Sequence, residues 1–371
     1  MSDPTPPAEG RPPGPDQVGP GGRRRRVLPG WPIWAVAVAV LLLLVGAGAV
    51  WAWNLRLPYY ALSPGPTQEV VDLISVDEQA EVQVFAPQGD LYFLTVLLQP
   101  VNVYEYLEAW LDPRVDVVER ENIRPPGTSE EELRRINRDL MDESKTFAVC
   151  VALQHLDFQA RCQGQGARVM GFVEGTPAAS VLQEGDVIVR IAGEAVNLAT
   201  DAVSLVAEQE IGERVPITVV RDGRRVQVEV RLVEHVQEPG RPMVGILLDT
   251  VDLNVRLPFD ITIDSHNVGG PSAGMMYTLG VIDLLSEGNL THGLVVAGTG
   301  TIRLDGEVGE VGGVRQKVFA ARAAGADYVL VPEGNYQEAL GATGGEIEVV
   351  AVSDLDEALR FLGSLERAAS S

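Results

Sequence analysis

Gly-Gly-Pro-Ser-Ala-Gly (269–274) and Gly-Gly-Val-Arg-Gln-Lys (312–317) are the two stretches that decide the architecture of the C-terminal half of this 371-residue chain. The first puts a serine in a glycine-rich turn before an apolar run, and the second puts a lysine on a helical pattern. The chain holds only two lysines, Lys145 and Lys317, and otherwise uses arginine for positive charge. Because a buried ammonium group can lose its proton whereas a guanidinium group cannot, Lys317 is a candidate base.

These two stretches predict that Ser272 and Lys317 form a nucleophilic pair. Pro271 suits the first turn of a helix, so we expect Ser272 at a helix N-terminus, where N–H groups and the helix dipole favour an alkoxide and an oxyanion. Lys317 shares an apolar stripe with residues at helical spacing, Val314, Val318 and Ala321. Burial on that stripe would lower the lysine pKa from its usual value of about 10.4. An ordinary lysine with its amine in water is the alternative.

The serine turn is also compatible with other chemistry. Residues 270–274 fit G-x-S-x-G, the nucleophile turn of α/β-hydrolases, which requires a later histidine. Only His292 follows the serine, close behind it, so the α/β-hydrolase interpretation fails. His266 remains an alternative base for Ser272. The other residues of the turn are candidates for binding the oxyanion or shaping the turn: Gly270, Pro271 and Ala273.

Charge is distributed unevenly along the chain. Residues 1–30 contain five arginines against three acidic residues, a net charge of +2, so the remainder carries −23 − 2 = −25. Such an acidic body argues against nucleic-acid binding, because phosphates would be repelled. The sequence has no spacing typical of metal ligands and no phosphate-binding loop of the Gly-x-x-x-x-Gly-Lys-Ser/Thr type. We therefore expect no metal, no cofactor and no ATP site.

An uncharged apolar stretch, 31–53, predicts a single transmembrane helix with tryptophans near both ends. Four arginines at 23–26 predict a cytoplasmic N-terminus and an extracytoplasmic remainder. A cleaved signal peptide is the alternative, since Ala47-Gly48-Ala49 has the small-x-small form. Residues 1–30, rich in proline and glycine, are expected to be a disordered tail. The two cysteines, Cys150 and Cys162, would then face an oxidising compartment and could pair.

Residues 54–160 are expected to form an N-terminal extracytoplasmic region. It begins with short extended pieces and contains a helix from about Thr128 to Leu156. Lys145 lies on this helix, next to Ser144, and is interpreted as a surface charge. Residues 166–234 have a different texture, in which short strands alternate with glycine turns. Strands at 215–220 and 225–232 flank Asp222-Gly223, a strong hairpin signal.

The C-terminal region, 240–365, predicts an alternating α/β pattern. The helix expected after the serine turn, to Leu285, is apolar nearly all round and should be central. The expected strands are 261–263, 294–298, 328–331 and 349–352, and the other expected helices are 314–324 and 355–362.

Residues 166–234 resemble a PDZ domain of the bacterial protease-associated type, through Gly-Thr-Pro-Ala (175–178) and Gly-Asp-Val-Ile-Val-Arg-Ile-Ala-Gly (185–193). The resemblance implies a small β-rich, partly open barrel that binds an extended chain or a C-terminus at a sheet edge. A spacer without ligand is the alternative. The expected groove residues are Val169, Met170, Gly171 and Phe172.

The serine and lysine stretches resemble the proteolytic domain of the Lon (S16) peptidases. Pro-Ser-Ala-Gly (271–274) matches one family element, and 299–317 matches the later family stretch T-G-x-I-x-L-x-G-x-V-x-x-(I/V)-G-G-(L/V)-x-x-K without a gap. The resemblance implies that Ser272 is the nucleophile, Lys317 the general base and Thr299 an orienting residue. The chain has Gly269 where the family usually has aspartate, which leaves no carboxylate there.

The order of an apolar helix, a PDZ-like segment and a Lon-like domain resembles the membrane-bound PDZ–Lon-like serine proteases of bacteria. The stretch at 58–66 also resembles that group. The implied fold is α+β, and residues 54–160 belong either to a separate domain or to a protease fold interrupted by the PDZ. The implied function is an ATP-independent endopeptidase in the bacterial cell membrane that cleaves unstructured extracytoplasmic polypeptides. An inactive PDZ adaptor and a small-substrate esterase or amidase are the alternatives. The pattern leaves the oligomeric state open.

Overall fold

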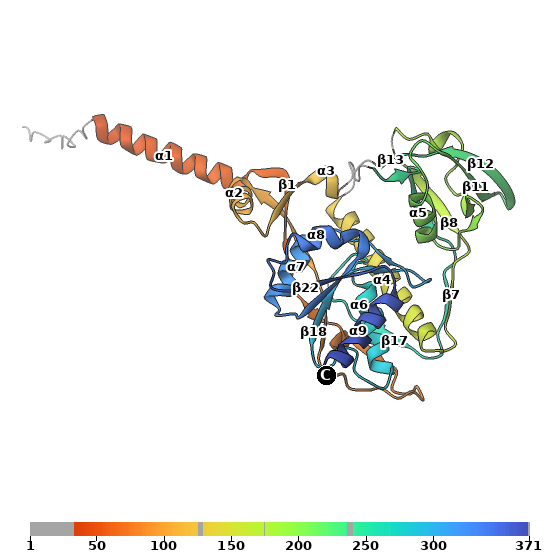
Figure 1. Cartoon of the computed structure of the whole chain (residues 1–371). Coiled ribbons are helices and arrows are strands. Elements are labelled where there is room, and N and C mark those ends of the chain that lie inside the picture. Colours follow the sequence, from red (N-terminus) through yellow and green to blue (C-terminus); the bar gives the residue numbers. More distant parts are fainter. Residues whose placement is uncertain (1–32, 125–128, 174, 236–239, 267, 370–371) are drawn as a thin grey trace, which may run out of the picture. The chain divides into compact units, whose positions relative to one another are not determined.

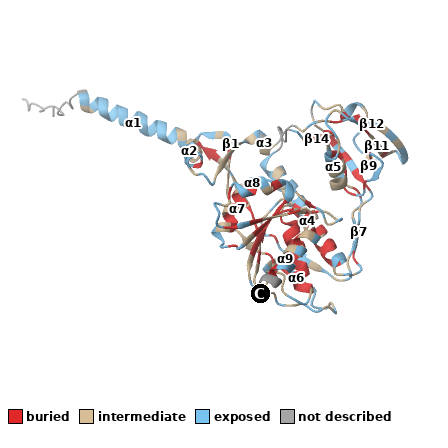
Figure 2. Cartoon of the chain, viewed as in Figure 1, coloured by how far each residue is buried: buried red, intermediate tan, exposed pale blue. Residues whose placement is uncertain are grey.

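The computed structural model describes residues 33–124, 129–173, 175–235, 240–266 and 268–369. The chain divides into two compact units, residues 1–54 and 55–371. The first contains α1 (Ile33–Asn54), an apolar helix whose segment Trp34–Asn54 has the length and composition of a membrane span. Most of α1 is pale blue, the colour of exposed residues, in Figure 2. The predicted tail, 1–30, lies outside the described residues.

The second unit is built around a five-stranded sheet in the order β2-β4-β18-β21-β22. Its strands are β2 (Gln68–Glu69), β4 (Asp90–Phe93), β18 (Val295–Gly298), β21 (Tyr328–Pro332) and β22 (Glu348–Val352). All neighbours pair in parallel except β2, which pairs antiparallel with β4. Parallel strands buried on both faces require helices on both sides, and the strands are accordingly rich in Val, Leu and Ala.

Helices cover both faces of this sheet (Figure 1). One core joins the sheet to α4 (Glu130–His155), α6 (Gly274–Leu285) and α9 (Leu355–Ala369), and every residue of α6 is buried. A second core joins the opposite face to α7 (Val314–Ala323) and α8 (Tyr336–Leu340). Figure 2 shows α6 almost entirely red, as expected for a helix that is apolar all round.

Segments from both ends of the second unit build this fold together. In addition to the β4–β18 pairing, β3 (Ile74–Val76) pairs antiparallel with β17 (Ile261–Ile263). A three-stranded sheet, β5-β1-β6, lies against α7 and consists of β1 (Arg56–Pro64), β5 (Val96–Asn102) and β6 (Asp116–Glu119). The helical segments of this region are η1 (Val71–Leu73), α2 (Val103–Leu111) and α3 (Arg120–Ile123).

The segment that resembles a PDZ domain has its own core and interrupts this fold. Its sheet has the order β12-β11-β9-β8-β15 and is faced by α5 (Ala199–Ala207). Its strands are β8 (Ala167–Phe172), β9 (Val187–Ile191), β10 (Glu194–Ala195), β11 (Arg214–Arg221), β12 (Arg224–Arg231) and β15 (Ile246–Thr250). Shorter elements are η2 (Ala178–Ser180), β13 (Val233–Glu234) and β14 (Pro242–Met243).

The chain enters and leaves this segment through one antiparallel ribbon. Its strands are β7 (Arg161–Gln163) and β16 (Asn254–Arg256). A disulfide joins Cys150 of α4 to Cys162 of β7, with Cα atoms 6.3 Å apart. The sequence had left this bond open, and it ties the ribbon to the helix that packs against α6.

The α+β fold predicted from the sequence is confirmed. The predicted strands of the C-terminal region lie close to their observed positions, whereas the closing helix, predicted at 355–362, continues to Ala369. The difference that matters for the site is the start of α6, which is Gly274 and not Ser272. The remaining elements, β19 (Thr301–Ile302), β20 (Val308–Gly309) and η3 (Glu333–Asn335), lie between β18 and α8 in the chain.

Candidate active site

Ser272 lies in the tight turn that leads into α6, directly before the N-cap residue Ala273. Its carbonyl oxygen accepts hydrogen bonds from the N–H of Gly300 (2.9 Å) and from the hydroxyl of Thr299 (3.0 Å). A Cβ atom at Gly274 would lie 2.9 Å from the backbone nitrogen of Ile302, so only glycine fits at the start of α6. The serine backbone is therefore held against the segment that follows β18.

Lys317 points into the protein from α7 and is only 2% exposed. Its Nζ atom donates a hydrogen bond of 3.0 Å to Thr299 Oγ1. Burial lowers the pKa of Lys317 to about 7, and the charge of Glu338 opposes that shift. A neutral amine is thus accessible near neutral pH. Gly313, the N-cap residue of α7, has φ of 67°, and a Cβ atom on it would lie 2.9 Å from Val96 Cγ1.

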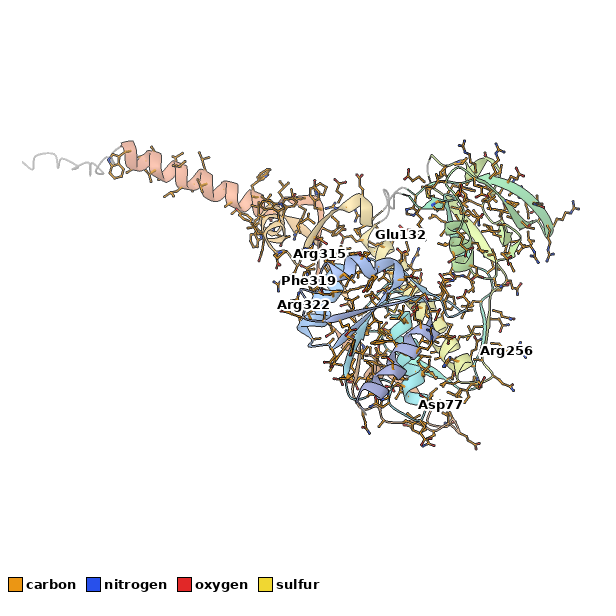
Figure 3. All side chains as sticks on the ribbon, in the orientation of Figure 1. Asp77, Glu132, Arg256, Arg315, Phe319 and Arg322 are labelled. Atoms are coloured by element: carbon orange, nitrogen blue, oxygen red, sulfur yellow. A yellow bond between two sulfur atoms is a disulfide. The ribbon has the colours of Figure 1, made fainter. Side chains whose placement is uncertain are left out.

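Other side chains of α7 are held by contacts separate from those of Lys317. Arg315 Nη1 and Gln316 Nε2 each donate a 2.6 Å hydrogen bond to a different carboxylate oxygen of Asp116, at the start of β6. The guanidinium groups of Arg315 and Arg322 lie 5.8 and 5.7 Å from the centre of the Phe319 ring, and Figure 3 labels all three residues on α7. This arrangement fixes the rotation of α7 about its axis.

Helix α4 supports the serine turn from the other side. The carbonyl of Asn137 accepts a 2.7 Å hydrogen bond from Gly270 N–H, and Ser144 Oγ donates a 3.0 Å bond to the carbonyl of Pro271. A Cβ atom at Gly269 would lie 3.0 Å from the Cβ of Asn137, so a larger side chain there would meet α4. Sequence reasoning missed Asn137, since nothing local links α4 to a turn so distant in the chain.

The three residues predicted to bind an oxyanion or to shape the turn differ in their backbone N–H groups. The N–H of Gly270 is occupied by Asn137, and Pro271 has no N–H to donate. Among the described residues, the N–H of Ala273 has no hydrogen-bond acceptor. The alternative base, His266, is exposed, and its Nδ1 lies 2.9 Å from Asp264, whose pKa this contact lowers.

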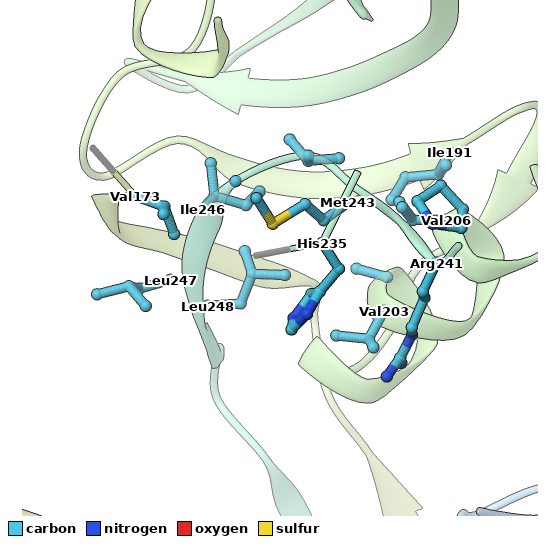
Figure 4. A pocket seen from close by; sticks show the side chains of 14 residues that line it. Val173, Ile191, Val203, Val206, His235, Arg241, Met243, Ile246, Leu247 and Leu248 are labelled. Atoms are coloured by element: carbon cyan, nitrogen blue, oxygen red, sulfur yellow. The ribbon is translucent and has the colours of Figure 1, made fainter. Parts of the chain in front are cut away.

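The PDZ-like segment holds a cavity of about 300 Å³ between α5 and β15 (Figure 4). Val203 and Val206 of α5 face Ile246 and Leu248 of β15 across it. None of the residues predicted to form the groove lines this cavity: Val169, Met170, Gly171 and Phe172. They belong to β8, which pairs with β15 on one side and β9 on the other.

Within the part of the chain that the structure describes, no group of three or more His, Cys, Asp or Glu side chains could hold a metal ion.

Comparison with family models assigns two regions of the second unit. Residues 250–362 match the Lon protease (S16) C-terminal proteolytic domain, and residues 141–232 match the PDZ domain. The chain carries a Lon-type proteolytic domain and a PDZ domain. The Lon-type match contains Ser272, Thr299 and Lys317, and the predicted resemblance to PDZ-containing Lon-like proteins is confirmed.

Similar proteins include several Lon proteases. Lon protease 2 of Bacillus subtilis is 35% identical over 136 residues, which are 37% of this chain and 23% of that protein. The peroxisomal Lon protease homolog 2 of Homo sapiens is 38% identical over 117 residues, 30% of this chain and 13% of that protein. The chain thus spans less than a quarter of the length of these relatives.

Among solved structures, the PDZ domain of the SdrC-like protein from Listeria monocytogenes is 28% identical, with a TM-score of 0.21, covering 23% of this chain and 87% of that one. A solution structure from Geobacillus thermodenitrificans is 32% identical, with a TM-score of 0.21, covering 22% of this chain and 95% of that one.

Proposed function

We propose that this chain is an ATP-independent, membrane-anchored serine endopeptidase in which Ser272 is the nucleophile and Lys317 the general base. The observation that carries this proposal is the 3.0 Å hydrogen bond from the buried Lys317 amine to Thr299, whose hydroxyl bonds the backbone of Ser272. A buried amine with a pKa of about 7 is half neutral near pH 7, as a general base must be. The alternative base His266 lacks such burial.

In the acylation step, the neutral Lys317 amine takes the proton of Ser272 Oγ as that oxygen attacks the peptide carbonyl. The tetrahedral intermediate carries its negative charge on the former carbonyl oxygen, and the N–H of Ala273 is the donor in the turn best suited to bind it. Lys317 then returns the proton to the leaving amine, and the C–N bond breaks. Water then attacks the acyl-enzyme and gives a proton to Lys317. Lys317 passes this proton to Ser272 Oγ as the carboxylic acid product leaves.

Thr299 has an orienting role in this mechanism. Its hydroxyl hydrogen goes to the carbonyl of Ser272, so its oxygen can accept from Lys317. The neutral amine donates one N–H to this hydrogen bond, and its lone pair can accept the serine proton.

ATP independence is proposed because the sequence has no phosphate-binding loop. Without an unfolding motor, substrates must offer an extended segment to Ser272, so we propose unstructured or already cleaved polypeptides. Recruitment is assigned to the PDZ domain. Among the described strands β15 pairs only with β8, which leaves its other edge beside the cavity for an extended chain.

Anchoring is assigned to α1, which has the length and composition of a membrane span. The arginines that precede it favour a cytoplasmic N-terminus in the bacterial cell membrane, with the catalytic domain outside.

The test is cleavage of an unfolded, fluorescently labelled protein by the full chain in detergent micelles without ATP. Ser272→Ala and Lys317→Arg should each abolish cleavage. The matched control is Lys145→Arg at the only other lysine, which pairs with Asp142 on the surface of α4 and should stay fully active. Activity that survives Lys317→Arg would overturn the lysine base. Hydrolysis of small esters without cleavage of polypeptide would indicate an esterase, and inactivity of the parent would favour an adaptor.

A further inference from the structure

Helix α2 exposes an apolar face that the fold of the second unit does not cover. Leu107, Trp110 and Leu111 are 51%, 71% and 73% exposed. At about 100° per residue they fall on one side of the helix, and the acidic residues Glu105 and Glu108 fall on another. We call Leu107, Trp110 and Leu111 the α2 patch. Single exposed apolar residues are ordinary, but a tryptophan and two leucines side by side are typical of an interaction surface.

The fold uses other residues of α2 for its own packing. Ala109 is the buried residue of the helix, and the Tyr106 ring lies 5.3 Å from the ring of Tyr59 on β1. The α2 patch could therefore be polar without loss of these contacts.

The N-terminus of α2 is tied to the first residue of β1. Asn102 caps α2, accepting hydrogen bonds from the N–H groups of Tyr104 (2.8 Å) and Glu105 (3.0 Å). The same Asn102 is the register partner of Arg56 in the β1–β5 pair. Arg56 Nη1 also donates a 3.1 Å hydrogen bond to Glu105 Oε2, which in turn accepts from Asn102 N–H.

Arg56 follows the last residue of α1, Asn54, by two positions in the chain. Two residues span at most about 7 Å, a strand pair about 5.5 Å and the nine residues of α2 about 13 Å. Whatever direction α1 takes, the Cα of Trp110 therefore lies within roughly 25 Å of the Cα of Asn54. Chain connectivity alone keeps the α2 patch close to the point where α1 ends.

We infer that the α2 patch inserts into the headgroup region of the bilayer that α1 enters, so that the catalytic unit is held against the membrane at a second point. The inference rests on the proposed anchoring by α1. Tryptophan and leucine on one face of a short helix are suited to the interface, where the indole ring is apolar and its N–H reaches a polar partner. Because α2 has no lysine or arginine, it has no side chain that would attract anionic headgroups. We therefore expect the contact to form with neutral phospholipid.

A second copy of the chain is the competing occupant. A stable protein interface buries about 800 Å² on each partner, more than three side chains supply, so the bilayer is favoured.

The test uses Trp110 as its own reporter, because the other tryptophans, Trp31, Trp34, Trp51 and Trp53, all precede it near the predicted span. The full chain with these four changed to phenylalanine is reconstituted in phosphatidylcholine vesicles with and without brominated acyl chains. We expect bromolipid to reduce Trp110 emission at least twofold and iodide to have little effect. Leu107→Gln with Leu111→Gln should reverse both results.

The matched control is a variant with Trp110→Phe and Ile211→Trp in the same background, since Ile211 is 45% exposed in the PDZ domain. Its emission should be quenched by iodide and not by bromolipid. For Trp110, quenching by iodide alone would overturn the inference, as would protection from both quenchers, which would indicate a protein partner. Vesicle flotation separates the two proposals: protein that does not float overturns the anchoring and this inference together, whereas floating protein without bromolipid quenching overturns this inference alone.

Discussion

Lys317 and Thr299 form a buried pair in which the lysine amine donates a 3.0 Å hydrogen bond to the threonine hydroxyl oxygen. The threonine in turn donates to the carbonyl of Ser272 at 3.0 Å. The three residues come from three separate segments of the chain. The Thr299 hydroxyl connects α7, which carries the lysine, to the turn that carries the serine. The proposed base and nucleophile are thus coupled through one hydroxyl.

The rate should follow the protonation of Lys317. Burial lowers the pKa of Lys317 to about 7, and only the neutral amine can accept the serine proton. We expect kcat/KM to fall about tenfold for each pH unit below 7 and to reach a plateau above it. Measurement from pH 5 to 9, with circular dichroism to verify folding at each pH, checks this. A profile that keeps rising toward pH 10 would contradict the lowered pKa.

Stability should also depend on Lys317. Its folded pKa lies near 7 and its ordinary value is 10.5, so between these values the unfolded chain binds more protons and the free energy of unfolding rises with pH. At about 1.4 kcal/mol for each pKa unit, Lys317→Met should be more stable than the parent by a few kcal/mol at pH 7 and below. The difference should shrink as the pH approaches 10.5. Urea unfolding of both proteins at pH 6 and pH 9.5 tests the sign.

Removal of the Thr299 hydroxyl should impair turnover more than binding. Thr299→Val keeps the shape of a fully buried side chain but leaves Lys317 without its acceptor, so we expect kcat to fall roughly 10²-fold with KM nearly unchanged. Thr299→Ser retains the hydroxyl and should restore most activity. Equal activity of the two variants would show that the hydroxyl has no orienting role.

The contact from α4 to the serine turn gives a further prediction. Ser144→Ala removes the 3.0 Å hydrogen bond to the carbonyl of Pro271, and we expect a stability loss of about 1 kcal/mol and a fall in kcat of about tenfold. Ser286→Ala is the matched control, because Ser286 bonds a carbonyl at the other end of α6. If both variants reduce kcat alike, the effect belongs to α6 as a whole and not to the turn.

The PDZ cavity should affect long substrates only. Val203→Glu puts a charge on the α5 side of the cavity, so KM for an unfolded protein should rise several-fold while kcat/KM for a short peptide stays constant. Val84→Glu, at an exposed valine outside the PDZ segment, is the control. A loss of short-peptide cleavage in Val203→Glu would contradict a role restricted to recruitment.

The sequence predicts those features that are local in the chain. The extent of α7 and the inward direction of Lys317 follow from helical periodicity, and the β11–β12 hairpin follows from one Asp-Gly turn. The apolar character of α6 correctly predicts a central helix. Its start is misplaced by two residues because the turn before it depends on Gly300, which is distant in the sequence.

Pairings between distant segments are decided by the tertiary structure alone. The sequence of β4 does not show that it pairs with β18, and the sequence of β3 does not show that it pairs with β17. Whether residues 54–160 belong to the protease fold was therefore left open by the sequence. The sheet of the PDZ domain is a further example. Its edge strand, β15, follows the predicted PDZ segment and joins the sheet only through long-range pairing. Periodicity and turn chemistry act over a few residues, and they determined the elements and the candidates Ser272 and Lys317. The hydrogen bonds with Thr299, Asp116 and α4 that orient these two residues and their helices require the folded chain.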